Sequence, residues 1–117
     1  MSVVYRHFRA DSPDWKRCGP PTEHSFTVCH DRDNRVMGVA ACSPKDQFSK
    51  KEGRTQAEYR AMIARQNRDQ LGLGPKVMVV SAPAFRPLNS RRYEQIILWA
   101  QREAGRDSLV IVRDDNG

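Results

Sequence analysis

Residues 24–42 read HSFTVCHDRDNRVMGVAAC and contain two apolar runs separated by a short polar segment. In the first run, Phe26 and Val28 alternate with smaller or polar residues, which is the two-residue period of a β-strand. The segment Asp31–Arg35 is rich in turn-forming residues, and a second apolar run, Val36–Cys42, follows it. The pattern predicts a β-hairpin, and the small residues of its second strand predict that a helix packs closely on it.

Further elements are expected on both sides of this hairpin. We predict strands over Val3–Arg9, Lys76–Ser81 and Leu109–Val112, a loop over Asp11–Glu23, and a helix over Ser90–Ala104. The order predicts an α+β fold, with a single mixed sheet made of the hairpin and crossover strands and two main helices packed on one face. The length predicts one domain over residues 1–117, with residues 113–117 as a flexible tail.

The segment after the hairpin is expected to form two helical pieces. Ser43-Pro44 is a helix-start signal, so a short helix is predicted to about Lys51, where Gly53 interrupts it. The Thr55–Glu58 segment has the form of a capping box and predicts a second start, for a helix that runs to about Arg68. The apolar stripe expected to face the core of this helix consists of Tyr59, Met62, Ile63 and Gln66.

Composition limits the classes of function. The 117 residues carry a net charge of +6, contain three cysteines and have no apolar run long enough to span a membrane. An odd number of cysteines without an export signal predicts free thiols and a cytoplasmic location. The cysteines and histidines lack the spacings of structural zinc sites, so neither a metal nor another cofactor is expected.

Basic residues are concentrated in one part of the chain. From Pro44 to Arg68 there are seven bases and three acids, and therefore four of the six net positive charges. Cations next to a helix start suit a phosphate or carboxylate, although these residues are equally consistent with the solvated faces of amphipathic helices. The expected anion-binding residues are Lys50, Lys51, Arg54, Arg65, Arg86, Arg91 and Arg92. Trp15 and Phe85 are the expected stacking or interface residues.

No recognised arrangement of catalytic residues is present. Asp31 and Asp33 fit a turn, and Cys42 is the only cysteine that precedes a predicted helix start, where a helix dipole lowers a thiol pKa. The chain is therefore expected to be a non-enzymatic binding protein. One alternative is a small enzyme acting on a phosphorylated or nucleic-acid substrate through His30 or Cys42. The other is a structural homodimer that associates through Trp15, Phe85 or Trp99.

One segment resembles known proteins. The sequence Asp46-Gln47-Phe48-Ser49-Lys50-Lys51-Glu52-Gly53-Arg54, with a hairpin before it and an alanine-bearing helix after it, resembles small accessory proteins of bacteriophages. The resemblance implies a protein that binds, as some such proteins inhibit host defence systems by occupying nucleic-acid sites or sequestering nucleotides. The expected partner is accordingly anionic: nucleic acid, a nucleotide or an acidic host protein.

Overall fold

A computed structural model of the chain describes residues 3–8, 25–42, 49–74, 76–83 and 91–115. Its strands form one mixed sheet in the order β1-β2-β3-β4-β5, in which β1, β2 and β3 are antiparallel neighbours and β3, β4 and β5 are parallel neighbours. The strands are β1 Val3–Phe8, β2 Ser25–Asp31, β3 Val36–Cys42, β4 Val77–Pro83 and β5 Leu109–Asp115. The α+β class and the single mixed sheet predicted from the sequence are confirmed.

The predicted hairpin is formed by β2 and β3, which pair from Asp31 with Val36 to Ser25 with Cys42. The Asp31 carboxylate closes the turn, because it accepts hydrogen bonds from the Asn34 backbone N–H at 3.2 Å and from Asn34 Nδ2 at 2.6 Å. Arg35 completes the turn in the left-handed region, with φ of 54°.

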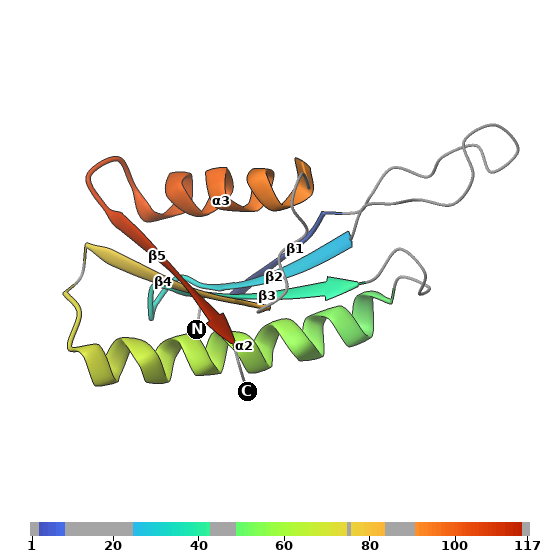
Figure 1. Cartoon of the computed structure of the whole chain (residues 1–117), viewed down its shortest axis with the longest axis horizontal. Coiled ribbons are helices and arrows are strands. Elements are labelled where there is room, and N and C mark those ends of the chain that lie inside the picture. Colours follow the sequence, from blue (N-terminus) through green and yellow to red (C-terminus); the bar gives the residue numbers. More distant parts are fainter. Residues whose placement is uncertain (1–2, 9–24, 43–48, 75, 84–90, 116–117) are drawn as a thin grey trace, which may run out of the picture.

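The two helices, α2 Lys50–Leu71 and α3 Arg91–Ala104, cover opposite faces of the sheet (Figure 1). On β2, Phe26 and Val28 lie in one core cluster with α3, whereas Cys29, on the other face, packs against alanines of α2. The expectation that both helices share one face is therefore wrong. The connections β3–α2–β4 and β4–α3–β5 each join parallel strands and step in the same direction across the sheet. Two such connections of the same hand would place both helices on one face. Because α2 and α3 lie on opposite faces, the two connections differ in hand, and one of them is left-handed. Such connections are rare, and the expectation had assumed right-handed ones.

α2 lies unusually close to β3, as the small residues of that strand predicted. The buried face of α2 consists of Ala57, Ala61 and Ala64, and a Cβ placed on Gly38 would lie under 3.0 Å from backbone atoms of the helix. Large side chains do not fit this approach. Tyr59 and Met62, expected in the buried stripe, are consequently 58% and 51% exposed.

α2 also begins earlier than expected and is continuous. Ser49 is its N-cap, and the Ser49 hydroxyl accepts a hydrogen bond from the Glu52 backbone N–H at 3.3 Å. Gly53 lies in the helix against Thr27 of β2, so it does not interrupt the helix, and Thr55 is not a cap. The hydroxyl of Thr55 instead donates back to the Lys51 carbonyl oxygen at 3.0 Å. The helix ends at Gly72, which has φ of 61°.

The main core lies between the sheet and α3. Ile96, Trp99, Ala100 and Ala104 of α3 pack on Phe8, Phe26, Val28 and the alternate residues of β3 and β4. Trp99 is only 9% exposed, so it is a core residue and not the interface residue considered for a homodimer. β5 extends to Asp115, which pairs with Pro83, so residues 113–115 belong to the sheet and not to a flexible tail.

Candidate functional site

Four of the predicted anion-binding residues lie on α2 with exposed side chains. Lys50, Lys51 and Arg54 are in the first turns of the helix, and Arg65 follows three turns after Arg54. At 100° per residue, Lys50, Arg54 and Arg65 fall within about 60° of one another around the helix axis. These three cations therefore fall on one stripe along α2, with Lys51 beside its start. The stripe borders the buried face of the helix at Ala61, and the Glu58 carboxylate lies about 20° around the helix from Arg65.

The start of this stripe coincides with the positive end of the helix dipole. α2 has 22 residues, and the backbone N–H groups of its first turn have no partners one turn earlier in the helix. Ser49 accepts from one of them, and Glu52 adds the only acidic side chain of this first turn. The helix dipole and the side chains of Lys50, Lys51 and Arg54 all contribute positive potential at this end of α2, and they favour an anion there.

Other arginines have structural roles that the sequence did not reveal. Arg60 donates to the Val39 carbonyl oxygen at 3.1 Å, and Arg68 donates to the carbonyl oxygens of Val77 and Gly74. Across the sheet, Arg35 donates to the Ala104 carbonyl oxygen at 2.7 Å and to Ser108 Oγ at 3.1 Å. These guanidinium groups join helices to strands and turns, so the net charge overstates the cationic surface that is open to a partner.

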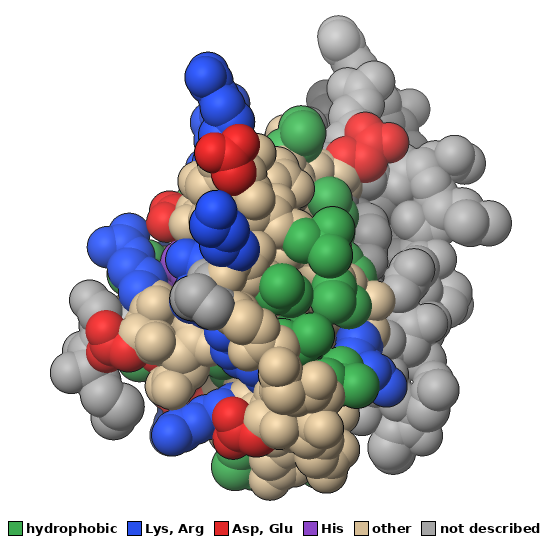
Figure 2. All heavy atoms as spheres, turned by 90° about the vertical axis from the view of Figure 1, so that its left-hand side faces the viewer, with side chains coloured by type: hydrophobic (Ala, Val, Ile, Leu, Met, Phe, Trp, Pro, Cys, Tyr) green, Lys and Arg blue, Asp and Glu red, His purple; other side chains and the backbone are tan. Residues whose placement is uncertain are grey.

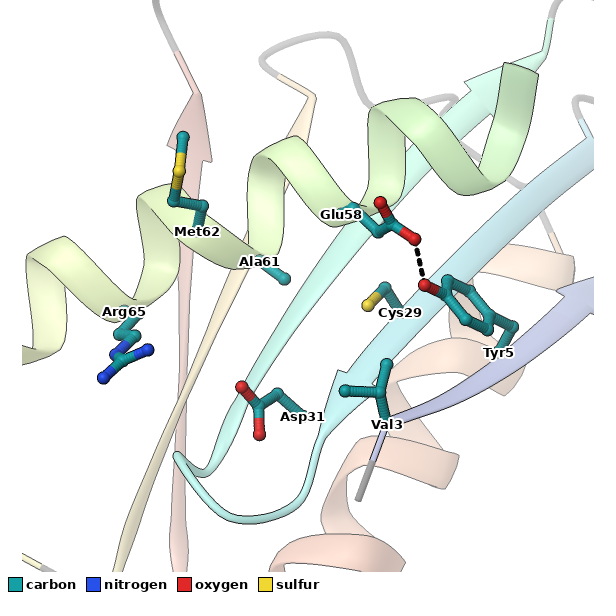
Figure 3. A pocket seen from close by; sticks show the side chains of 8 residues that line it. All are labelled: Val3, Tyr5, Cys29, Asp31, Glu58, Ala61, Met62 and Arg65. Carbon is teal, nitrogen blue, oxygen red and sulfur yellow. Dashed lines mark hydrogen bonds between the residues drawn. The ribbon is translucent and has the colours of Figure 1, made fainter. Parts of the chain in front are cut away.

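A pocket of about 330 Å³ lies beside the basic stripe, between α2 and the strands β1 and β2 (Figure 3). Its lining consists of Val3, Tyr5, Cys29, Asp31, Glu58, Ala61, Met62 and Arg65. The hydroxyl of Tyr5 and the carboxylate of Glu58 point toward one another and form a hydrogen bond from the sheet to the helix. With two carboxylates and one arginine, the pocket is not suited to a phosphate, although Arg65 belongs both to it and to the stripe.

Tyr5 and Cys29, which line this pocket, are both neutral near pH 7. The hydrogen bond to Glu58 raises the pKa of the Tyr5 phenol, and burial adds to the effect. Burial and the nearby Glu58 and Asp31 carboxylates raise the pKa of the Cys29 thiol to about 11. The Cys29 thiol therefore stays protonated near neutral pH and is not an activated nucleophile.

The second predicted basic cluster is not assembled within the part of the chain that the structure describes. Arg86, Phe85 and Trp15 lie outside the described residues. Arg91 and Arg92 are the first two residues of α3, and their side chains are not among those described. Their assignment as anion-binding or stacking residues stays a prediction.

A cluster that the sequence did not indicate lies on the α3 face. His30 is 2% exposed, its ring lies edge-on to Trp99 at 5.9 Å, and its Nδ1 is 3.9 Å from a Glu103 carboxylate oxygen. The guanidinium of Arg6 lies over the ring of Trp99 at 5.3 Å. Burial lowers the pKa of His30, so its imidazole is neutral near pH 7. His30 and the basic stripe are on opposite faces of the sheet, so His30 does not supply a base beside that stripe, as the enzyme alternative required.

Among the described residues, no three His, Cys, Asp or Glu side chains lie close enough together to hold a metal ion. Neither described helix is both long and apolar enough to cross a membrane. Comparison of the chain with models of protein families, with curated proteins and with solved structures finds no match.

Proposed function

We propose that this chain is a non-enzymatic binding protein that engages a nucleic acid through the exposed cations of α2. The observation that carries the proposal is the stripe formed by Lys50, Arg54 and Arg65, with Lys51 beside it. Arginine and lysine side chains contact phosphates directly, and they release the counterions that surround a polyanion.

The length of the stripe favours an extended anion over a single nucleotide. Lys50 and Arg65 are fifteen residues apart on one continuous helix, which corresponds to about 22 Å at the helical rise of 1.5 Å per residue. That distance spans about six steps of a nucleic-acid strand at 3.4 Å per step. A nucleotide could occupy only one end of the stripe, and its binding would not need both Arg54 and Arg65.

The same geometry favours binding to the backbone over recognition of bases. Within the described residues of α2, the only aromatic side chain on the exposed surface is Tyr59, which lies about 140° around the helix from Arg54. Stacking on bases would therefore have to come from other parts of the chain. We expect affinity that depends strongly on salt and weakly on sequence.

The setting in which such a protein would act is a further part of the proposal. The Asp46–Arg54 segment resembles phage accessory proteins, some of which inhibit host defences by occupying nucleic-acid sites. Of that segment, the structure describes Ser49–Arg54, which cap and begin α2 and include three of the four cations. A cytoplasmic inhibitor of a host defence system is the role consistent with this resemblance.

Binding is tested by fluorescence anisotropy with labelled single-stranded and duplex DNA and RNA, over a salt series from about 50 to 200 mM. With four phosphate contacts, log K should fall against log salt with a slope of about −3.6 for duplex DNA and about −2.8 for single strands. The triple variant Lys50→Glu, Lys51→Glu, Arg54→Glu should abolish the salt-sensitive binding.

The matched control is Lys76→Glu, Arg102→Glu, Arg106→Glu, which changes the net charge equally. These three side chains are exposed and lie outside the stripe. If both triple variants lose affinity to the same extent, the binding reflects net charge and the proposed site is wrong. If the unchanged protein binds no nucleic acid even at low salt, the proposed function is wrong.

A further inference from the structure

β5 forms one edge of the sheet, and its outer side has no partner strand among the described residues. The Leu109 N–H donates to the Lys76 carbonyl oxygen at 2.9 Å, on the β4 side. Backbone groups alternate in direction along a strand, so the N–H and C=O groups of Val110 and Val112 point to the free edge. This edge therefore presents a regular set of donors and acceptors to a further strand.

The first part of β5 lacks the features that normally protect such an edge, whereas its last three residues, Arg113, Asp114 and Asp115, are charged. Its first four residues, Leu109–Val112, contain no charge, proline or glycine. Their side chains are only partly covered: Leu109 is 61% exposed, and Val110, Ile111 and Val112 are intermediate.

Further hydrophobic side chains are exposed at the end of the molecule where β5 begins. α2 packs on β2, β3 and β4, with most of its contact on β3, so it leaves the same face of β5 largely open. Figure 2 shows hydrophobic side chains gathered in a band on the end of the molecule where β5 begins and α2 ends. Leu71 and Leu109, two of the exposed large hydrophobic residues, belong to that end.

We propose that β5 pairs antiparallel with β5 of a second copy of this chain, so that two sheets join into one continuous sheet. A two-fold axis perpendicular to the sheet reverses the strand and keeps each face on its own side, which is what an antiparallel pair of identical strands needs. Centred on Ile111, this axis places Ile111 opposite its own copy, Val110 opposite Val112, and Leu109 opposite the aliphatic stem of Arg113.

This register satisfies both the backbone and the side chains. Val110 and Val112, whose backbone groups face the free edge, become the hydrogen-bonded pairs of the new ladder. No carboxylate is placed opposite Leu109–Val112. If the axis moves to Val112, Asp114 and Asp115 instead fall opposite Val110 and Leu109. The apolar part of the strand is thus self-complementary in the register centred on Ile111, and this favours a second copy over an unrelated peptide.

The first test is the mass of the unchanged protein in solution, measured by sedimentation equilibrium. At about 0.1 mM chain, where any dimer with a Kd below that concentration is the main species, we expect twice the 13.4 kDa of one chain. Two chains of net charge +6 repel each other, so added salt should strengthen this association. Phosphate binding weakens with salt, which distinguishes failure of this inference from failure of the proposed function.

Val110→Pro removes an N–H that faces outward and leaves the hydrogen bonds to β4 in place, so it should give a folded monomer. Ile111→Lys is a second variant with the same expected result, by placing two lysines on the axis. A monomeric mass for the unchanged protein, or a dimer that survives both variants, would refute the pairing. The pairing would also be refuted if the unchanged protein were a monomer that binds an extended peptide along β5.

Cross-linking tests the register directly. Ile111 and its copy form a non-hydrogen-bonded pair with a Cα–Cα distance of about 4.5 Å, which is within disulfide range. Ile111→Cys should therefore give a covalent dimer on mild oxidation, above the level seen for the unchanged protein with its own thiols. Val3→Cys, on the opposite edge of the sheet, is the matched control and should not. Equal cross-linking at both positions would contradict the proposed interface.

Discussion

The close approach of α2 to β3 depends on the absence of a side chain at Gly38. A Cβ at this position would lie under 3.0 Å from three backbone atoms of the helix: the oxygen of Ala57, the nitrogen of Ala61 and the carbonyl carbon of Arg60. The farthest of these, the Arg60 carbon, is at 2.8 Å, so reaching even a tight contact of 3.4 Å requires a shift of 0.6 Å, and the other two require more. Because the obstructing atoms are backbone, no side-chain rotation can relieve the clash.

We therefore expect Gly38→Ala to force α2 away from the sheet and to loosen Ala57, Ala61 and Ala64 together. Overpacking of a tight core costs about 1–3 kcal/mol, and a rigid obstruction on this scale should lie at the upper end. A loss of about 3 kcal/mol is a large part of the stability of a domain. It corresponds to a fall in Tm of about 10 °C for a chain of this length.

The measurement is thermal and urea unfolding followed by far-UV circular dichroism. The matched control is Gly74→Ala, because a Cβ at Gly74 would meet nothing within 4 Å and its backbone is not in the left-handed region. This control should change the free energy of unfolding by less than about 1 kcal/mol. If Gly38→Ala has the same midpoint as Gly74→Ala, the close packing of α2 on β3 is not what the structure describes.

Two further predictions concern ionisable groups. Burial lowers the folded-state pKa of His30, so the unfolded chain binds more protons at mildly acidic pH. The stability contributed by neutral His30 is full above the unfolded-state pKa of about 6.5, and it is lost as pH falls from there through the lower pKa of the folded state. His30→Gln should flatten the dependence of unfolding free energy on pH between about 5 and 7 by up to about 1.4 kcal/mol per pH unit, and an unchanged slope in urea titrations would contradict the assignment. Tyr5→Phe removes the hydrogen bond to Glu58 and should cost about 1 kcal/mol in the same unfolding assay. Tyr59→Phe, at an exposed position without a described hydrogen bond, should cost less than about 0.5 kcal/mol, and equal losses would argue against the Tyr5 contact.

Much of the sheet could be predicted because its signals are local. The alternation around Phe26 and Val28, and the turn formers after Asp31, specify the hairpin without any knowledge of the rest of the chain. The uniform apolar run of β4 likewise indicated a strand covered on both faces, and the structure buries Met78, Val79 and Val80.

The buried face of α2 could not be found by looking for large apolar residues, because close packing selects the smallest ones. Gly53, Ala57, Ala61 and Ala64 recur at helical spacing, but their meaning depends on Gly38, a partner on another element. A capping box at Ser49–Glu52 was present in the sequence and would have given the correct start of the helix. The placement of the helices on opposite faces depends on the hand of the connections, which local sequence does not encode.

The sequence predicted only part of the candidate site. Lys50, Lys51 and Arg54 were identifiable as exposed cations because they cluster in sequence. Their alignment with Arg65 required the helix to be continuous through Gly53. The use of Arg60 and Arg68 to hold strand and turn carbonyls depends on tertiary geometry, and charge counting assigns such residues to the surface by default.

Because α2 and α3 pack on different faces of the sheet, consecutive residues of the central strands contact different helices. Cys29 contacts the α2 side, and His30, the next residue, contacts Trp99 of α3. The two sides can therefore accumulate substitutions almost independently, with compensating changes confined to odd or to even positions of β2. A variant library of this strand should separate into two sets of tolerated residues, and the cations of α2 could diversify toward new partners without repacking the core beneath α3.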